Sequence, residues 1–317
     1  MNQPSQIPNW LQPFIGVIRP LHRWLRPRLG VLRQYPERPL KIPRSYLNTI
    51  ASQHSPALTL VTPSFNQGVF LLRTVRSVID QNYPNLEYVI QDGGSTDGTV
   101  ELLTGMDFHV TRWESTADRG QSHAINKGFQ NTTGDIMGWI NSDDILLPGA
   151  LAFVARYFSL NPHIDVVYGH RLLIDEHDAE IGTWLMPRHE DSILYWADFI
   201  PQETMFWRRR IWDRAGGRID ESFQFAMDWE LILRFHHAGA KFARLPRFLG
   251  GFRVHANQKT SASIGLLGLK EMGILRRREL GRTPTKSEID KVIRNYQLRH
   301  LIREWFWRMR WYIERAT

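Results

Sequence analysis

The sequence predicts an α/β protein in which helices flank a mostly parallel sheet. Two successive units each begin with a short apolar stretch and continue through a polar loop into a helix pattern, over residues 58–79 and from residue 86 past residue 100. Such units imply parallel strands, and ligands of such sheets bind at the carboxyl ends of the strands. A third apolar stretch, 136–140, leads into two adjacent acids, Asp143 and Asp144. The loops after these strands are therefore where a site is expected.

The loop of the second unit combines an acid with several glycines. Asp92 follows the apolar strand 86–90, and Gly93, Gly94 and Gly98 let a ligand approach the backbone closely. A carboxylate placed there can accept hydrogen bonds from a base or from ribose hydroxyls. The alternative is an ordinary glycine-rich turn held by local side-chain bonds. Neither loop carries a phosphate-binding glycine motif, so phosphate charge is expected to fall to a metal ion.

The run from Asn141 to Asp144 is the most informative segment of the chain. Two ionised carboxylates beside a buried strand lose hydration, which a cation can replace. The chain has no cysteine, and oxygen ligands favour Mg²⁺ or Mn²⁺, ions that keep part of their shell for substrate phosphates. A solvated turn that caps a helix is the alternative.

Four segments, in this order, resemble family 2 glycosyltransferases with the GT-A fold over about residues 58–255. They are the Pro-Ser-Phe-Asn loop, the Asp-Gly-Gly-Ser-Thr-Asp-Gly loop, the segment 118–128 and the Asn-Ser-Asp-Asp run. The resemblance implies a nucleotide site formed by Pro63, Ser64, Phe65, Asn66, Asp92, Ser122, Asn126, Ser142 and Asp143. It also implies that Asp143 and Asp144 hold Mn²⁺ or Mg²⁺ on the diphosphate. Many relatives carry aspartate where this chain has Asn141, which puts only that contact in doubt.

The second half of the chain is expected to bind the acceptor and to supply a base. Asp228 opens a predicted helix whose apolar positions Leu231, Ile232 and Phe235 face inward. It resembles the catalytic base of the family. Relatives often have an acid just before it, where this chain has Met227, so help from a second carboxylate is expected to be missing. The alternative is a carboxylate that only caps the helix.

A histidine near the end of the predicted domain is a third candidate metal ligand. Residues 252–255 alternate as a strand, and His255 is followed by a polar loop, 256–263. Relatives often place a histidine here as an additional ligand, and neutral imidazole can complete an oxygen-rich shell. A surface histidine with no such role is the alternative. The tryptophans Trp139, Trp184, Trp196, Trp207 and Trp229 are expected mostly in the core.

The positive charge of the chain lies at its two ends. The net charge is +8, of which residues 1–50 carry +7 and residues 266–317 another +7, leaving −6 for the middle. We therefore expect a basic, proline- and aromatic-containing extension over 1–50, a GT-A domain over 55–260, and basic amphipathic helices over 261–317. Neither end contains a membrane span or a signal-peptide pattern. Basic helices with Trp and Phe favour an anionic membrane surface, and the alternative is docking on the domain or on a second subunit. Nucleic acid is not expected, because the middle is acidic.

These observations predict a metal-dependent inverting glycosyltransferase. It would transfer a sugar from a nucleotide-sugar donor, with UDP or dTDP favoured, to a saccharide or lipid-linked acceptor, as in cell-surface polysaccharide or glycolipid synthesis. The absence of cysteine suits a cytoplasmic protein, peripheral at the inner face of the membrane. One alternative is a nucleotidyltransferase, which needs a glycine-rich loop with a basic residue after the first strand. Another is a membrane-surface adaptor whose GT-A-like core is inactive.

Overall fold

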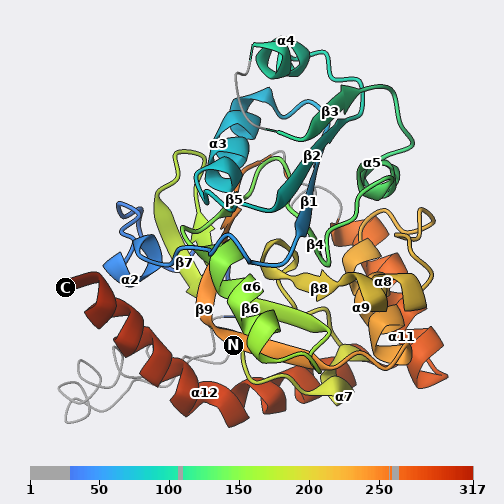
Figure 1. The fold of residues 1–317 in the computed structure, drawn as a ribbon. Helices are drawn as coiled ribbons and strands as arrows, with labels where there is room; N and C mark the ends of the chain where they lie inside the picture. The colour runs from blue at the N-terminus through green and yellow to red at the C-terminus, as the bar shows by residue number, and fades with distance from the viewer. Residues whose placement is uncertain (1–28, 106–109, 257, 259–263, 317) are drawn as a thin grey trace, which may run out of the picture.

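A nine-stranded sheet, flanked by helices, forms the centre of the molecule (Figure 1). The computed structural model describes residues 29–105, 110–256, 258 and 264–316, so the stretch 1–28 and most of the loop expected at 256–263 lie outside it. The strands are β1 (Leu58–Ser64), β2 (Leu86–Asp92), β3 (Arg112–Ser115), β4 (Ile136–Trp139), β5 (Ile145–Leu146), β6 (Val166–Ile174), β7 (Glu180–Trp184), β8 (Phe206–Arg208) and β9 (Phe242–Arg253). Their order is β3-β2-β1-β4-β8-β6-β9-β5, and β7 pairs with β6.

The helices alternate with the strands in the first half, and η3, α11 and α12 follow the last strand. They are α2 (Arg44–Leu47), α3 (Gly68–Ile79), α4 (Thr99–Thr104), α5 (Gln121–Phe129), α6 (Ala150–Leu160), α7 (Asp191–Leu194), η2 (Gln202–Thr204), α8 (Arg209–Arg214), α9 (Met227–His237), η3 (Ile264–Gly268), α11 (Leu269–Leu280) and α12 (Lys286–Ala316). In the described part of the chain, no helix is both long enough and apolar enough to cross a membrane.

The α/β class is confirmed, and the sheet is parallel in its first half. Strands β3, β2, β1 and β4 are parallel neighbours, with Ser64 opposite Asp92 and Asp92 opposite Ser115. This register brings the ends of three strands to one edge, where the predicted loops begin. Beyond β4 the sheet is mixed, because β8 pairs antiparallel with both β4 and β6 while β6 and β9 are parallel.

Burial of both sheet faces explains why the strands are continuous apolar runs. All seven residues of β1 and all nine of β6 are buried, as expected for strands covered by helices on both sides. Trp139, Trp207 and Trp229 are at most 1% exposed, which confirms the expectation that they pack in the core. Helix α3 buries Leu71, Val75 and Val78 at the predicted helical spacing, and α9 begins beside Asp228 as predicted.

Residues 252–255 alternate in burial, with Arg253 and His255 buried and the other two half-buried, although strand β9 ends at Arg253. Arg253 is fully buried in β9, a strand with neighbours on both edges. Its guanidinium group has its own partners there: it pairs with the carboxylate of Asp178 at 2.5 Å and donates to the backbone oxygens of Asp143 at 2.7 Å and Asp175 at 2.9 Å. Paired in this way, a buried charge is tolerated.

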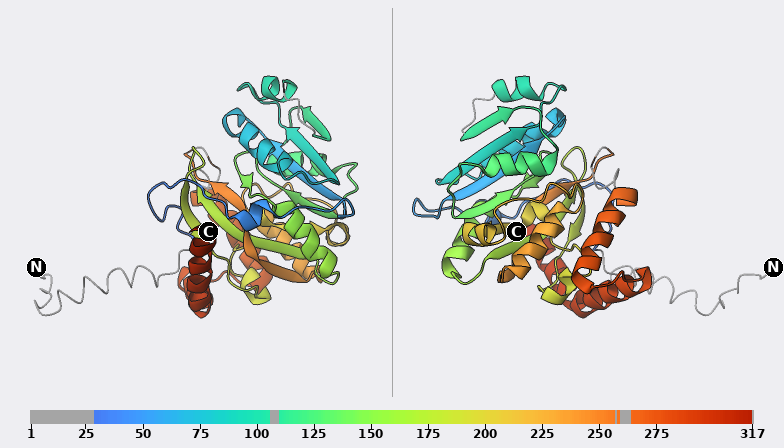
Figure 2. Two further views of the ribbon diagram at one scale, coloured as in Figure 1. Left: turned by 60° about the vertical axis from the view of Figure 1, so that its left-hand side comes forward. Right: turned by 90° about the vertical axis from the view of Figure 1, so that its right-hand side faces the viewer.

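Both described flanks of the domain pack on it. Tyr46 and Trp311 share a buried cluster with Phe248, and their rings lie 5.5 Å apart. The buried Glu180 accepts a hydrogen bond from the Tyr35 hydroxyl at 2.5 Å and pairs with Arg315 at 2.7 Å. Tyr35, Tyr46, Trp311 and Arg315 therefore dock on the domain, which was the alternative to a membrane contact for the two ends of the chain. Helix α12 lies along the edge of the molecule in the views of Figure 2.

Candidate functional site

The acid run lies next to the predicted histidine because of one short strand pairing. Strand β5 begins directly after the acids and pairs antiparallel with β9. Asp143 precedes β5 and His255 follows β9, so this pairing brings the two residues together. The Asp143 Oδ2 atom lies 3.0 Å from His255 Nε2. The Asp143 side chain is 20% exposed and that of His255 only 2%, with the imidazole packed on the ring of Phe70 at 4.7 Å.

Asp144 is oriented differently from Asp143. It is 1% exposed, and its Oδ1 atom accepts the backbone N–H of Arg253 at 3.0 Å. Burial, followed by the charges of Asp143 and Glu203, raises the pKa of Asp144 well above its usual value. The structure therefore gives Asp144 a role in anchoring β9, and its predicted contact with a metal ion stays a prediction.

The donor set at Asp143 and His255 fits a hard divalent cation with an incomplete protein shell. Within the described part of the chain, no three Asp, Glu or His side chains converge on one point. Mg²⁺ commonly takes only one or two carboxylates and completes its shell with water and substrate phosphates. A carboxylate and an imidazole at this spacing are compatible with that pattern for Mg²⁺ or Mn²⁺.

A buried ion pair that the motifs did not predict lies close to these acids. Arg171, in β6, donates its Nε–H to Glu203 at 2.7 Å and makes a second bond to the same carboxylate. Burial alone would lower the pKa of Arg171, but Glu203, Asp144 and Asp198 outweigh burial and raise it. Arg171 thus lies within electrostatic reach of both the acid run and the acceptor half. A lone arginine inside the apolar run of β6 was the signal that could have found it.

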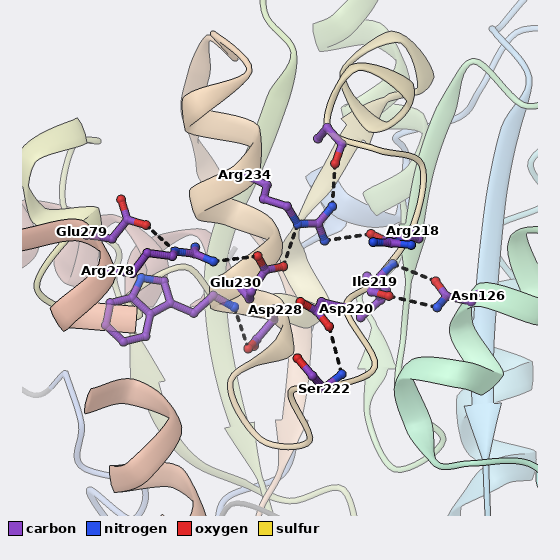
Figure 3. Close-up of polar contacts among 12 residues, drawn as sticks. Asn126, Arg218, Ile219, Asp220, Ser222, Asp228, Glu230, Arg234, Arg278 and Glu279 are labelled. Carbon is purple, nitrogen blue, oxygen red and sulfur yellow. Dashed lines mark hydrogen bonds and ion pairs between the residues drawn. The ribbon is translucent and has the colours of Figure 1, made fainter. Parts of the chain in front are cut away.

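The predicted base has a second carboxylate nearby after all. Asp228 lies in the first turn of α9, where its Oδ1 atom accepts the backbone N–H of Trp229 at 2.8 Å (Figure 3). Asp198 lies within electrostatic reach of Asp228, and desolvation, followed by the charge of Asp228, raises the pKa of Asp198 above its usual value. The second carboxylate near Asp228 therefore belongs to the segment after α7. It does not belong to position 227, where relatives of the family often have an acid.

The segment that leads into α9 is held by a single carboxylate. Glu271, in α11, is 5% exposed and accepts the backbone N–H groups of Gln224, Phe225 and Ala226 at 2.8–2.9 Å. These three bonds fix the entry of the chain into the helix that carries Asp228.

Glu230, on the same helix, has a structural role. It is 2% exposed and lies between Arg234 at 2.7 Å and Arg278 at 3.0 Å (Figure 3). Both of its carboxylate oxygens pair with arginines, so Glu230 is a poor candidate for the base.

The two predicted nucleotide loops, which follow β1 and β2, are hydrogen-bonded to each other. Asp92 is fully buried and accepts from Gly94 N, Ser95 N, Ser95 Oγ and Ser115 Oγ at 2.6–3.1 Å. Asn66, with φ of 52°, accepts the N–H of Thr96 at 2.9 Å. Asp92 therefore shapes the loop, and a direct contact with a nucleotide stays a prediction.

Other predicted nucleotide residues differ in how accessible they are. Phe65 is 61% exposed, whereas Pro63, Ser64 and Ser142 are buried. The buried Ser64 Oγ atom has no hydrogen-bond partner in the described part of the chain. A ligand that reached it would satisfy that hydroxyl group.

Ser122 and Asn126 connect α5 to the acceptor half. The Ser122 hydroxyl donates to the backbone oxygen of Phe223 at 3.1 Å. The Asn126 amide donates to the Ile219 oxygen at 3.0 Å and accepts the Ile219 N–H at 2.7 Å (Figure 3). Both side chains therefore hold the segment before α9, and their predicted nucleotide contacts stay predictions.

Comparisons with known proteins agree with this arrangement. An uncharacterized glycosyltransferase of Mycobacterium tuberculosis is 28% identical over 186 residues, covering 57% of this chain and 69% of the relative. The chondroitin synthase of Escherichia coli is 27% identical over 58% of this chain and 27% of its own length. The solved structure of TarS from Staphylococcus aureus superposes with a TM-score of 0.58 at 16% identity, over 77% of this chain and 72% of that one, and so shares the fold. The model of glycosyl transferase family 2 matches residues 59–217, about half of the chain, and this protein belongs to that family.

Proposed function

We propose that this protein transfers a sugar from a nucleoside diphosphate donor to an acceptor hydroxyl, with inversion at the anomeric carbon. The observation that carries the proposal is the pairing of Asp143 with His255 at 3.0 Å, at the end of β4. It places a carboxylate and an imidazole where the carboxyl ends of parallel strands meet, the usual place for ligands of such sheets.

The choice of donor and acceptor is supported by related proteins. A TarS structure of the same fold contains UDP-GlcNAc, which supports a uridine or thymidine diphosphate donor here. Chondroitin synthase and an O-antigen biosynthesis protein of Myxococcus xanthus are among the relatives. We therefore propose a saccharide or lipid-linked acceptor, in cell-surface polysaccharide or glycolipid synthesis, and action in the cytoplasm at the inner face of the membrane.

Asp143 and His255 would hold Mn²⁺ or Mg²⁺ against the diphosphate. The ion supplies positive charge that stabilises the departing diphosphate. The contribution of the chain is to keep the two side chains in place. The Phe70 ring supports the imidazole, and Arg253 binds the backbone oxygen of Asp143 at 2.7 Å.

Asp228 would act as the general base. As the acceptor oxygen attacks the anomeric carbon, its proton passes to the Asp228 carboxylate, and the bond from that carbon to the diphosphate breaks. A one-step displacement of this kind inverts the configuration. Asp198 supports the role, because a second carboxyl group nearby favours proton uptake by the pair.

Calorimetry with UDP, dTDP and GDP, each with and without Mn²⁺, tests the proposal. We expect Mn²⁺-dependent binding of a uridine or thymidine diphosphate that is lost in Asp143→Ala and in His255→Ala. His163→Ala is the matched control, because His163 is exposed and makes none of the site contacts. Equal affinity in the presence and absence of Mn²⁺, or wild-type binding by both site variants, contradicts the assignment.

A further inference from the structure

Helix α12 has two faces with different surroundings. On one face, Trp311 is 3% exposed and Tyr296 2%, and both pack against the domain. On the other, large apolar side chains point away from it. These are Leu298 at 52% exposure, Trp305 at 48%, Phe306 at 59%, Met309 at 36% and Ile313 at 60%.

The exposed side chains, here called the apolar stripe (Leu298, Trp305, Phe306, Met309 and Ile313), form one continuous band. Successive members are seven, one, three and four residues apart, which places them within about 100° on one side of a helix. An aromatic-rich band of this kind on a helix at the edge of the molecule (Figure 1) is unusual for a surface in contact with water alone.

A basic pocket lies beside this helix, between α12, the start of β9 and the segment after β7. Three arginines line it, Arg188, Arg244 and Arg303, together with His300. Among the residues that the structure describes, none of the three arginines forms an ion pair, and the buried Nε of Arg244 has no hydrogen-bond partner. Burial, followed among the neighbouring cations by Arg303 and Arg188, lowers the pKa of Arg244. The pocket thus brings three guanidinium groups together, while the nearby carboxylate of Glu190 pairs with His300 and Arg299.

The pocket is separate from the candidate catalytic site. Arg244 lies near the start of β9 and Arg253 at its end, a separation of roughly 30 Å for nine extended residues. None of the residues assigned above to the metal, the base or the nucleotide lines the pocket. The pocket is therefore distinct from the candidate catalytic site.

The described chain begins at the same pocket, because Leu29, the first described residue, is one of the pocket's lining residues. In the sequence, the 28 residues before it contain four arginines and no acid, together with Trp10, Phe14 and Trp24.

We propose that this face binds an anionic membrane, with the apolar stripe inserted among the lipids and a lipid phosphate held in the pocket by Arg188, Arg244 and Arg303. Guanidinium groups are well suited to phosphate, and an apolar helix face flanked by basic residues is suited to the boundary between headgroups and acyl chains.

Charge is the reason to prefer a membrane to a second copy of the chain. Residues 266–317, which include α12, carry +7, so two copies that met through this helix would repel each other. An anionic lipid surface attracts the same charges.

Sedimentation of the full chain with vesicles tests the proposal, using phosphatidylcholine alone or mixed with phosphatidylglycerol. We expect preferential binding to the anionic vesicles, weakened by salt. The triple variant Trp305→Ser/Phe306→Ser/Met309→Ser should weaken binding at least tenfold. Loss of basic charge near the surface costs about fivefold per residue, so Arg188→Gln/Arg303→Gln should also weaken it at least tenfold.

Two control variants separate this face from the rest of the surface. Leu160→Ser removes a side chain that is 70% exposed on α6, and Arg76→Gln/Arg218→Gln removes two exposed arginines from other elements. Both should bind anionic vesicles as wild type does. Nucleotide affinity, measured by calorimetry, should be the same in all of these proteins, so a failure of the membrane proposal is distinguishable from a failure of the glycosyltransferase proposal.

Three results would overturn the proposal. The first is equal binding of wild type to neutral and anionic vesicles, and the second is wild-type binding by the stripe variant. The third is a concentration-dependent dimer in analytical ultracentrifugation that the stripe variant abolishes, which would assign the face to a second copy.

Discussion

Asp228 and Asp198 form a pair of carboxyl groups that neither sequence position reveals alone. Asp228→Asn keeps the shape of the side chain but cannot take up a proton. We expect turnover to fall about 10²- to 10⁴-fold with donor affinity little changed. Initial rates and donor binding, measured on the same preparations, check this, with the exposed Asp213→Asn as a control. Near-normal turnover in Asp228→Asn would move the role of the base to another acid, with Asp198 the first to test.

The residues of the candidate site differ in how far the sequence could predict them. Asp143 and His255 stand out because an acid run and a histidine follow apolar strands, and the structure places them side by side. Arg171 and Glu203 have no such signal, because their contact depends on how β6 lies beside η2, which local residues do not encode. Met227 led to the expectation of a missing second acid, since sequence neighbours cannot reveal that Asp198 approaches from another segment.

Strand β2 carries a carboxylate that holds the start of β4 and so the acid run that follows. Glu87 accepts from Thr59 Oγ1 at 2.6 Å, Thr133 Oγ1 at 2.6 Å and the N–H groups of Thr133 and Gly134 at 2.8 and 3.0 Å. Burial alone would raise the pKa of Glu87, but the bonds from Thr133 and Thr59 outweigh burial and lower it to about 2.

The depressed pKa of Glu87 predicts a pH-dependent contribution to stability. The unfolded chain takes up this proton near its ordinary pKa of 4.5. The contribution is therefore full above about pH 4.5 and is lost as the pH falls toward 2. We expect Glu87→Gln to lower the free energy of unfolding by about 1 to 2 kcal/mol at pH 7 and by less at pH 3. Urea unfolding at both pH values measures this, with exposed Glu101→Gln as control. An equal loss at both pH values would exclude the charge as the cause.

Helix α9 depends on α11 for its position. Glu271→Gln replaces an acceptor of three backbone N–H groups with an amide that presents N–H groups of its own, so at least one bond should be lost. We expect turnover to fall while donor affinity stays unchanged, because the displaced segment carries Asp228. Glu271→Ala should be worse in both turnover and thermal stability. Unchanged turnover in Glu271→Gln would show that the three bonds only stabilise the fold.

Elements of the first half were easier to predict than those of the second. Strands β1, β2 and β4 are short apolar runs that end at polar loops, and their parallel pairing follows from the helices between them. Strands β8 and β9 were not predictable in the same way. Strand β8 pairs with β4 and β6, and strand β9 pairs with β6 and β5. These partners lie in distant segments of the chain. Non-local pairing leaves no periodic trace in the sequence.

At the scale of the whole molecule, the described parts of the two expected extensions pack on the domain. Tyr46 and Trp311 close one cluster, so the segments expected as extensions contribute to the core. Removal of residues 296–317 should therefore lower the thermal midpoint. The reason is that this deletion removes Trp311 and the ion pair of Arg315 with Glu180.

Two tryptophans on α12 separate the two roles of this helix. Trp311 is 3% exposed and Trp305 is 48% exposed, so the same substitution probes opposite faces. Trp311→Ala should cost about 3 kcal/mol or more of folding free energy, the scale of a large aromatic removed from a core. It should change vesicle binding little under conditions where the variant is folded. Trp305→Ala should change the urea midpoint little and weaken binding to anionic vesicles, because nearly half of that side chain is exposed to solvent. If Trp305→Ala destabilises the protein as much as Trp311→Ala does, the exposed face of α12 is covered in solution, and a membrane contact through it is excluded.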